Sequence, residues 1–532
     1  MHDLVRAMAL KITKRKYMVI SDSWSLKEIL IQGDWIKDLE KVCLMCEDDI
    51  EIPDGMSMGC PNLTTLICWL PNLEFISDSF MSQLDNLCFL NLSGSGIEKL
   101  PNSLSNLENL KVLNLQGCWG LVDIPDLGKL KKLRELDLSH TRIEKVPQGM
   151  EELANLTFLS LIFAESLKTL PEGLFLNFPL LQCLRLPYTV KAPVEEIVSL
   201  KCLEEFNGRV ENVSDLSKFF TYGKSQFLDI FHIVVVGEDD EWLRECKRSR
   251  DYGSFRHQLN QVKVRGCDLK NEDLSVLVQD IPSLTLTKCK GLSNSLFDAF
   301  PRLSKPSSLK VLEISDCEEI ECLLPFLTAN LEYKSRFPLL RNIERINLIR
   351  LPNFIAFFQN IGAAIQPPPP QAIISSSLRH LEIWECDRMR KLGLPSSAFP
   401  NLEKIHIERC NELEEIIEVQ EGEGRVVSLP KLKNFFLWEL PSLNSVCNTT
   451  MSCASVERID LIACPELEKL PLYFDPTSPS PPKTLKEIWV RKGDERWWKS
   501  MEWEHPTHGH LLQPLVKFTF WNQCFDGLGY PY

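Results

Sequence analysis

Two groups of histidine and cysteine residues have spacings that suit metal binding or thiol chemistry. His505, His508 and His510 lie close together near the end of the chain, and imidazole is a common zinc ligand. Cys43 and Cys46 have the Cys-x-x-Cys spacing of redox dithiols. No cysteine or carboxylate set at zinc spacing accompanies the histidines, and the cysteine pair spans one expected strand. We therefore interpret the histidines as part of a solvated loop and the cysteines as structural, and expect neither a bound metal nor an enzyme.

Seven other cysteines share one position of a repeated sequence. Each lies three residues after the second apolar residue of a Leu-x-Leu pair or its equivalent. These cysteines are Cys118, Cys267, Cys289, Cys317, Cys386, Cys410 and Cys464. Their placement predicts that each thiol turns into the bend after a strand, donates to backbone groups and fills a small buried site. We expect reduced thiols, which favours an intracellular protein.

The repeated sequence is a leucine pattern. Leu110, Leu113 and Leu115 form the motif L-x-x-L-x-L, which returns about every 23 residues, within the range of leucine-rich repeats. Alternating apolar residues predict a short strand in each unit. The central apolar residues are Val42, Leu66, Leu90, Leu113, Leu136, Leu159, Leu184, Phe206, Ile233, Val262, Leu284, Leu312, Ile346, Leu381, Ile405, Phe435, Ile459 and Ile488. About 18 stacked units predict an α/β leucine-rich-repeat solenoid with a curved parallel sheet on its concave face.

Changes in the repeat divide the chain into five segments. The segments are residues 1–33 before the repeats, a regular half at 34–220, an atypical repeat or insertion at 221–260, an irregular half at 261–495, and a C-terminal cap and tail at 496–532. In the regular half the second turn carries the sequence I/L-x-x-L-P, as from Ile97 to Pro101, and its proline favours an extended turn. Trp497, Trp498 and Trp503 suit a cap, because large rings cover an exposed last layer of core efficiently.

The composition limits the partners and the location of the chain. The formal net charge is −14, so there is no electrostatic reason to bind a phosphate backbone, and we expect no nucleic-acid partner. No apolar run is long enough for a transmembrane segment. Residues 14–16 put the basic charges after the apolar stretch, which is the reverse of a signal peptide. These features favour the cytoplasm, with the nucleus or the periphery of the plasma membrane as further locations.

Side chains between the inward-facing leucines are candidates for partner binding, because they point out of the concave face. In the second half these positions, and those beside them, carry large rings and arginines, as binding hot spots often do. The candidates are Arg345, Arg379, Trp384, His406, Phe436, Trp438 and Trp489. The alternative is that the rings pack against the cap or against loops. We expect alanine at Phe436 and Trp438 to weaken partner binding without unfolding the array.

The N-terminal residues carry a more specific motif. Apolar residues at positions 4, 5, 8, 9 and 12 form one stripe of a helix, and Asp3 suits its N-cap. In company with the repeats, the sequence MHDLVRAMAL at residues 1–10 resembles the MHD motif of plant NB-LRR (NLR) immune receptors, particularly the coiled-coil class. In that family the motif ends the nucleotide-binding switch domain, just before the repeats. Residues 35–45 and 497–504 are also similar to the family, so the resemblance covers essentially the whole chain.

The resemblance implies roles for His2 and Asp3. His2 would contact the β-phosphate of ADP, Asp3 would fix the geometry of that loop, and residues 1–33 would be the end of the winged-helix switch domain. The phosphate loop G-x-x-x-x-G-K-(S/T) does not occur in this sequence. We therefore expect no cofactor for this chain itself and ADP or ATP only in a full-length parent. The chain would be a fragment, a truncated gene product or a receptor remnant.

The resemblance also implies a recognition function in plant defence. The repeats would bind a pathogen effector or a guarded host protein, and the N-terminal half would hold the nucleotide-binding domain of the same receptor in its inactive state. Two alternatives stay open. A ubiquitin-ligase adaptor would need an F-box helix bundle, for which residues 1–33 are too short. An extracellular repeat ectodomain would need a signal peptide and paired capping cysteines.

Overall fold

The chain forms two compact units in a computed structural model. Unit 1 comprises Met1–Val234 and Asp240–Arg250, and unit 2 comprises Val235–Asp239 and Asp251–Tyr532. The residues that the structure describes are 16–33, 35–53, 55–221, 228–237, 241–242, 260–272, 274, 281–296, 308–324, 342–358, 377–395, 400–418, 426–472, 481–503 and 506–520. The MHD-like motif with His2 and Asp3, and also His505, lie outside these residues.

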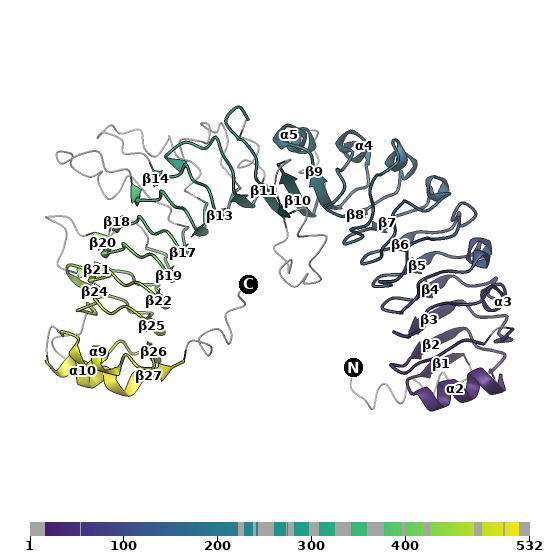
Figure 1. Ribbon diagram of the computed structural model, residues 1–532, viewed down its shortest axis with the longest axis horizontal. Helices are drawn as coiled ribbons and strands as arrows, with labels where there is room; N and C mark the ends of the chain where they lie inside the picture. Colours follow the sequence, from purple (N-terminus) through teal and green to yellow (C-terminus); the bar gives the residue numbers. More distant parts are fainter. Residues whose placement is uncertain are drawn as a thin grey trace. The chain divides into compact units, whose positions relative to one another are not determined.

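Unit 1 is a stack of short parallel strands. Its strands are β1 (Tyr17–Ile20), β2 (Lys41–Met45), β3 (Thr65–Trp69), β4 (Phe89–Asn91), β5 (Val112–Asn114), β6 (Glu135–Asp137), β7 (Phe158–Ser160), β8 (Cys183–Arg185), β9 (Glu205–Val210) and β10 (Ile230–Val236), the last at the unit boundary. Its helices are α2 (Ser23–Gln32), α3 (Asp78–Met81), η1 (Asn102–Asn106), η2 (Met150–Glu152), η3 (Leu174–Asn177), α4 (Val194–Ser199) and α5 (Val213–Thr221). The strands line the concave side of this unit, α3, α4 and α5 lie on its convex side, and α2 lies across its N-terminal end (Figure 1).

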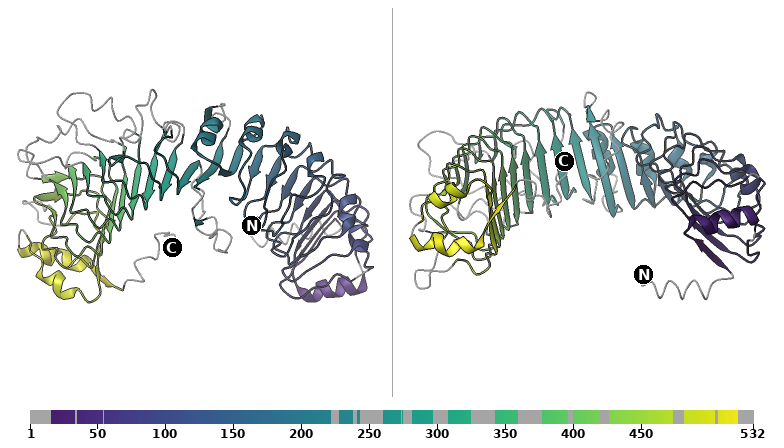
Figure 2. Two further views of the ribbon diagram at one scale, coloured as in Figure 1. Left: turned by 45° about the horizontal axis from the view of Figure 1, so that its top comes forward. Right: turned by 60° about the horizontal axis from the view of Figure 1, so that its bottom comes forward.

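Unit 2 repeats the design with longer strands. The strands of its main sheet are β11 (Gln261–Arg265), β12 (Ser283–Thr287), β13 (Val311–Ser315), β15 (Arg345–Ile349), β17 (His380–Trp384), β19 (Lys404–Glu408), β22 (Asn434–Trp438), β25 (Arg458–Ile462), β26 (Glu487–Arg491) and β27 (Val516–Thr519). On the opposite side lie β14 (Cys322–Leu324), β16 (Ala356–Phe358), β18 (Lys391–Pro395), β20 (Glu415–Glu418), β21 (Val426–Ser428), β23 (Ser445–Cys447) and β24 (Thr450–Ser452). The C-terminal helices are α9 (Glu495–Ser500), α10 (Pro506–Leu512) and η8 (Gln513–Leu515). Figure 2 shows the main strands of this unit stacked side by side in one direction.

The register of the strands follows the leucine pattern. Within unit 1, Leu113 pairs with Leu136, and Leu136 pairs with Leu159. Within unit 2, Ile405 pairs with Phe435, which pairs with Ile459. All the central residues predicted for the repeats lie within strands, and nearly all are fully enclosed by the core. The expected leucine-rich-repeat solenoid is therefore confirmed.

Two strands of the sheet were not expected. Strand β1 pairs with β2, Met18 beside Val42, and β27 pairs with β26, Val516 beside Ile488. The segment at residues 1–33 thus contributes a strand to the stack, although we placed it before the repeats. Helix α2 follows that strand and buries Leu26 and Leu30. Whether the same segment also ends a switch domain stays a prediction.

The proline turns of unit 1 are extended, as expected. Pro101 has φ −71° and ψ 149°, and the neighbouring Lys99 forms parallel bridges to Phe75 and Asp123. The short helix η1 begins directly after this proline, so Pro101 precedes a helical turn and does not end one.

The cysteine column lies in the bends after the strands. The thiols of Cys118, Cys289 and Cys464 contact carbonyl oxygens of the preceding repeat, at 3.2 Å from Leu92, 3.4 Å from Val264 and 3.4 Å from Leu437. Cys267, Cys386 and Cys410 instead contact carbonyls of their own repeat, and Cys267 is only half-buried. The column thus fills small buried sites and bonds backbone groups, as the sequence predicted.

Burial should protect this column from thiol reagents. It raises the pKa of the Cys118, Cys386 and Cys464 thiols to about 12, so at pH 8 roughly one such thiol in ten thousand is ionised. We expect iodoacetamide at pH 8 to alkylate the exposed Cys202 and to leave these three intact until denaturant is added. Peptide mass spectrometry measures the difference. Modification of the three at the rate of Cys202 in the folded chain would contradict this assignment.

Candidate functional site

The candidate site is the open face of the main sheet in unit 2. Neighbouring parallel strands lie about 4.8 Å apart, so residues in equivalent register become neighbours on one face. The register places His406 beside Phe436, and Phe436 beside Asp460, which in turn neighbours Trp489. Two residues further along the strands, Trp438 lies between Glu408 and Ile462. The sheet therefore brings residues from across some hundred positions of sequence into one patch.

The predicted rings form one contact cluster. The ring centre of His406 lies 4.8 Å from that of Trp438, 5.7 Å from that of Phe436 and 5.6 Å from that of Trp384. The planes in these pairs are steeply inclined, which is the edge-to-face arrangement that aromatic quadrupoles favour. Trp489 packs against the group formed by Phe436, Trp438 and Ile462. Five of the seven predicted partner-binding residues are thus brought together.

The cluster is much less exposed than expected. His406 and Trp438 are 0% exposed and Phe436 is 2% exposed, whereas Trp384 and Trp489 are half-buried. The expectation of open rings is therefore wrong for the first three. Contacts between rings of adjacent strands contribute to this burial. Cationic side chains add to this, with the Arg458 guanidinium 5.3 Å from the Phe436 ring centre and 4.1 Å from that of Trp489.

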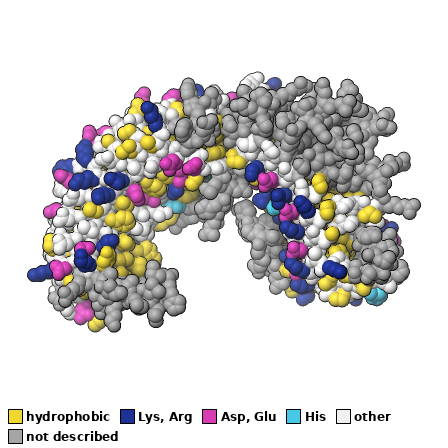
Figure 3. All heavy atoms as spheres, turned by 180° about the vertical axis from the view of Figure 1, so that it is seen from behind, with side chains coloured by type: hydrophobic (Ala, Val, Ile, Leu, Met, Phe, Trp, Pro, Cys, Tyr) yellow, Lys and Arg dark blue, Asp and Glu magenta, His cyan; other side chains and the backbone are white. Residues whose placement is uncertain are grey.

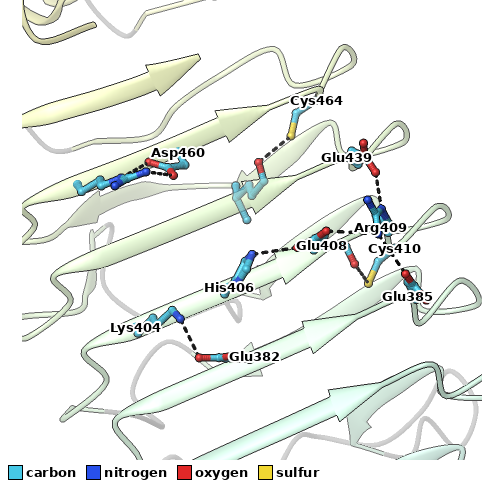
Figure 4. A network of polar contacts seen from close by, with 12 residues as sticks. Glu382, Glu385, Lys404, His406, Glu408, Arg409, Cys410, Glu439, Asp460 and Cys464 are labelled. Atoms are coloured by element: carbon cyan, nitrogen blue, oxygen red, sulfur yellow. Dashed lines mark hydrogen bonds and ion pairs between the residues drawn. The ribbon is translucent and has the colours of Figure 1, made fainter. Parts of the chain in front are cut away.

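Charged side chains that the sequence analysis did not single out complete the patch. Arg458 holds both carboxylate oxygens of the fully buried Asp460, at 2.7 and 2.8 Å. Burial raises the pKa of Asp460, and the hydrogen bond from Arg458 acts in the opposite direction. Lys404 forms a second pair with Glu382 at 2.8 Å (Figure 4). These residues occupy the same alternating positions as the rings, so the pattern that found the rings could also have found them.

The two predicted arginines lie near the beginning of the strands. Arg345 is the first residue of β15, half-buried and paired in register with His380. Burial lowers the pKa of His380, and the charge of Arg345 lowers it further. Arg379 directly precedes β17, is exposed, and forms an ion pair with Glu403 at 2.9 Å. Both arginines therefore belong to the edge of the face, and a role in binding stays a prediction for each.

The described residues offer little for metal chemistry. Within them, no three histidine, cysteine or acidic side chains are arranged to hold a metal ion. His508 is buried, and His510 lies on the same helix, α10, so the expectation of a solvated loop is wrong for these two residues. Of the Cys43 and Cys46 pair, one is half-buried in β2 and the other is buried just after it.

Comparison with known proteins identifies the kind of repeat. One family model, described as a leucine-rich repeat region, matches residues 89–321, and another, described as plant disease resistance protein RPS2-like leucine-rich repeats, matches residues 359–492. A disease resistance protein of Arabidopsis thaliana is 26% identical over 97% of the chain, and a probable one from the same plant is 28% identical over 88%. The chain is similar to the leucine-rich-repeat regions of plant disease resistance proteins.

This repeat region spans about half of its relatives, since the alignments cover 51% of each of the two Arabidopsis proteins. Among solved structures, a leucine-rich-repeat protein of Leptospira interrogans has a TM-score of 0.43 and 17% identity, covering 74% of this chain and 95% of that one. Across the described ranges, no helix combines the length and the apolar character needed to cross a bilayer. The resemblance to plant resistance proteins expected from the sequence is confirmed.

The enclosed rings should behave as core residues. Replacing Trp438 with alanine leaves a cavity and should lower the free energy of unfolding by about 3–5 kcal/mol. This corrects the expectation that Phe436 and Trp438 can be truncated without loss of stability. Urea unfolding followed by circular dichroism measures the change. Trp69→Ala is a matched control, because Trp69 is 40% exposed; equal effects of the two substitutions would contradict the core assignment of Trp438.

Proposed function

We propose that this repeat region is the recognition part of a plant immune receptor that acts inside the cell. Its ligand would be a pathogen effector or a guarded host protein, bound on the sheet face and the adjoining edges. The observation that carries the proposal is the alignment with disease resistance proteins over nearly the whole chain. The half-buried rings of Trp384 and Trp489 and the exposed Arg379 support a binding role, because aromatic and arginine side chains dominate protein interfaces. No catalytic step belongs to this proposal.

The receptor would work by differential binding. An effector that binds the active state more tightly than the inactive state shifts the equilibrium by that difference in free energy. The nucleotide-binding domain would hold ADP in the inactive state, with His2 at the β-phosphate and Asp3 shaping the loop, as the MHD-like motif implies. The cytoplasm is the location that this mechanism needs. Neither alternative, the ubiquitin-ligase adaptor or the extracellular ectodomain, is favoured by the relatives reported above.

The N-terminal end of unit 1 supports the second part of the proposal, the contact with a nucleotide-binding domain. Helix α2 buries Leu26 and Leu30 against the stack, yet Trp24 is 72% exposed and Ile31 is 81% exposed. These two residues are seven apart, so they lie on one face, two turns from each other. Exposed apolar residues grouped in this way mark a surface that another part of a protein covers. We assign that face to the nucleotide-binding domain of the same receptor.

Recognition can be tested by exchanging the repeats. When this region replaces the corresponding region of a related resistance protein of known specificity, we expect the response of the chimeric receptor to follow the repeats. Leaf cell death after co-expression with candidate effectors provides the measurement, and both parental receptors serve as controls. A response that always follows the nucleotide-binding half would show that these repeats do not carry specificity.

The contact between α2 and the nucleotide-binding domain can be tested with the two parts of the receptor expressed as separate chains. We expect the repeat region and a separately expressed nucleotide-binding domain of the same receptor to co-purify, because α2 presents an apolar face. Charges on that face, Trp24→Asp with Ile31→Asp, should reduce recovery at least tenfold. Val122→Asp is the matched control, since Val122 is also an exposed apolar residue of unit 1 but lies away from α2. Recovery unchanged by the α2 substitutions, with both proteins folded, would refute the assigned contact.

A further inference from the structure

One column of residues in unit 2 has an unusual backbone. In six successive repeats the residue directly after the strand is charged and has a positive φ, between 48° and 55°. The column consists of Lys288, Asp316, Arg350, Glu385, Arg409 and Glu439, and we call it the strand-end ladder. Residues with a β-carbon rarely adopt this left-handed conformation, and arginine, lysine and glutamate have no local hydrogen bond that favours it.

The fold itself requires the left-handed turn at this position. Each ladder residue donates its backbone N–H to the next repeat, as Arg350 does to the Trp384 carbonyl at 2.8 Å and Arg409 to the Trp438 carbonyl at 3.0 Å. Other repeats meet the same requirement with glycine, at Gly117 in unit 1 and Gly266 in unit 2, or with an uncharged residue, at His140, Phe163 and Ala463. Glycine is the residue that suits a positive φ best. The ladder residues are therefore held in place by the sheet, with their β-carbons in fixed directions.

Stability does not account for the charged side chains. Arg350 pairs with Asp316 at 2.7 Å, and Arg409 pairs with Glu439 at 2.6 Å and with Glu385 at 3.3 Å (Figure 4). The arginines in these pairs are about half exposed, and solvent-exposed ion pairs contribute little to folding. Glycine would serve the turn better in every one of these repeats. The property that needs an explanation is therefore the charge itself, and unfavourable backbone at a surface is a pointer to function.

Alternation of charge alone is not specific to this edge. The residues before the strands also alternate in sign along unit 2. That second column, the strand-start ladder, consists of Lys310, Glu344, Arg379, Glu403, Lys433, Glu457 and Lys486. In that column each charged residue lies beside one of opposite sign in the adjacent repeat, so alternation allows ion pairs and avoids like charges. None of the seven residues has a positive φ. The left-handed backbone distinguishes the strand-end ladder.

The strand-end ladder also borders a groove. The groove has a volume of about 930 Å³ and runs from Asp316 to Arg491, with Pro352, Pro441 and Pro465 beside the charged residues. Figure 3 shows basic and acidic side chains in alternation along one edge of this unit, without distinguishing the two ladders. The wall opposite the ladder carries Glu318, Asp387 and Asn411 as well as the three prolines, so it adds acidic groups to the groove. The sheet makes the ladder wall rigid. A partner that binds here meets a preformed row of charges at regular spacing.

We propose that the strand-end ladder and its groove bind an α-helix of a protein partner that presents acidic and basic side chains in alternation, one per turn. Successive residues of the ladder, which we call its rungs, are separated by the strand spacing of about 4.8 Å. A helix repeats one face every 5.4 Å, whereas an extended chain repeats it about every 6.6 Å, so the helix keeps register over more rungs. Acidic residues would lie opposite Arg350 and Arg409, and basic residues opposite Glu385 and Glu439. This inference rests on the proposed recognition role and specifies its surface.

The probe is a fluorescein-labelled, alanine-based helical peptide with Glu and Lys alternating on one face at every turn. A second peptide has the same composition with its glutamates in one block and its lysines in another, and a third carries only lysine. Fluorescence anisotropy at low salt measures binding to the whole chain. We expect the alternating peptide to bind at least tenfold more tightly than the block peptide, with affinity falling as salt is added. Equal binding of these two, or tightest binding of the lysine peptide, would overturn the proposal.

Substitutions then locate the site. Arg409→Gly with Glu439→Gly removes two rungs, keeps the backbone hydrogen bonds and suits the positive φ. We expect at least a tenfold loss of affinity for the alternating peptide, with no fall in the melting temperature. The matched control is Glu457→Ala with Lys486→Ala, which removes an exposed ion pair of the strand-start ladder and should leave binding unchanged. Loss of binding in the control, or none in the ladder variant, would place the peptide elsewhere.

The peptide assay uses no natural partner, so its result separates the two ideas. If the alternating peptide does not bind but the exchanged repeats still carry specificity, the ladder proposal fails and the recognition role stands. If the peptide binds but specificity never follows the repeats, the ladder is a binding surface and the immune role fails.

Discussion

The backbone hydrogen bonds that join the beginning of each strand to the preceding repeat fix the register of the strands, and the positions of the side chains on the sheet depend on that register. The Arg134 N–H donates to the Lys111 carbonyl at 2.8 Å, and the Thr157 N–H donates to the Arg134 carbonyl at the same distance. In unit 2, the Lys433 N–H donates to Glu403 in the same way. Because equivalent atoms bond in every pair, a slip of one residue would turn the leucines of a strand from the core to the surface. The register is therefore fixed by both the backbone and the core.

A fixed register converts a linear repeat into columns. The nearest neighbours of a surface side chain are its equivalents in the adjacent repeats, some 20 to 35 positions away in sequence. The shared register therefore brings the ring of His406 into contact with that of Phe436. It also places Arg409 between Glu385 and Glu439, with which it forms ion pairs. Each column then has its own physical role. Leucines supply the burial that stabilises the stack, cysteines fill the bends, and the outer columns are left to interact with one another or with a partner.

The sequence predicted which residues occupy each column better than it predicted how deeply those residues are buried. Alternation identified the central residues of the expected repeats, because leucines at fixed spacing report directly which side faces the core. It missed β1 and β27, because the residue three positions before the centre is Arg15 for Met18 and Gln513 for Val516, where the motif needs an apolar residue. It also assigned Phe436 and Trp438 to the correct face but not their burial, which depends on the size of side chains in neighbouring strands.

The left-handed column could have been found only indirectly. Arginine and glutamate give no local sign of a positive φ, so Arg409 and Glu439 resemble ordinary surface residues in the sequence. The available signal was the glycine at the same repeat position, at Gly117 and Gly266, which marks where the turn is left-handed. Transferring that requirement from one repeat to the next is legitimate here because the hydrogen-bond register is shared.

The same constraint explains why a stack of this kind suits recognition. Each repeat packs on its two neighbours, so a substitution in an outer column alters contacts with no more than those neighbours and leaves the leucine and cysteine columns intact. Arg350, for example, pairs with Asp316 and, at longer range, interacts with Glu385. A change of charge at one rung would therefore change the binding surface locally, while the free energy of folding is supplied by residues that do not reach the surface. Stability and specificity are carried by different columns, and the backbone register keeps them apart.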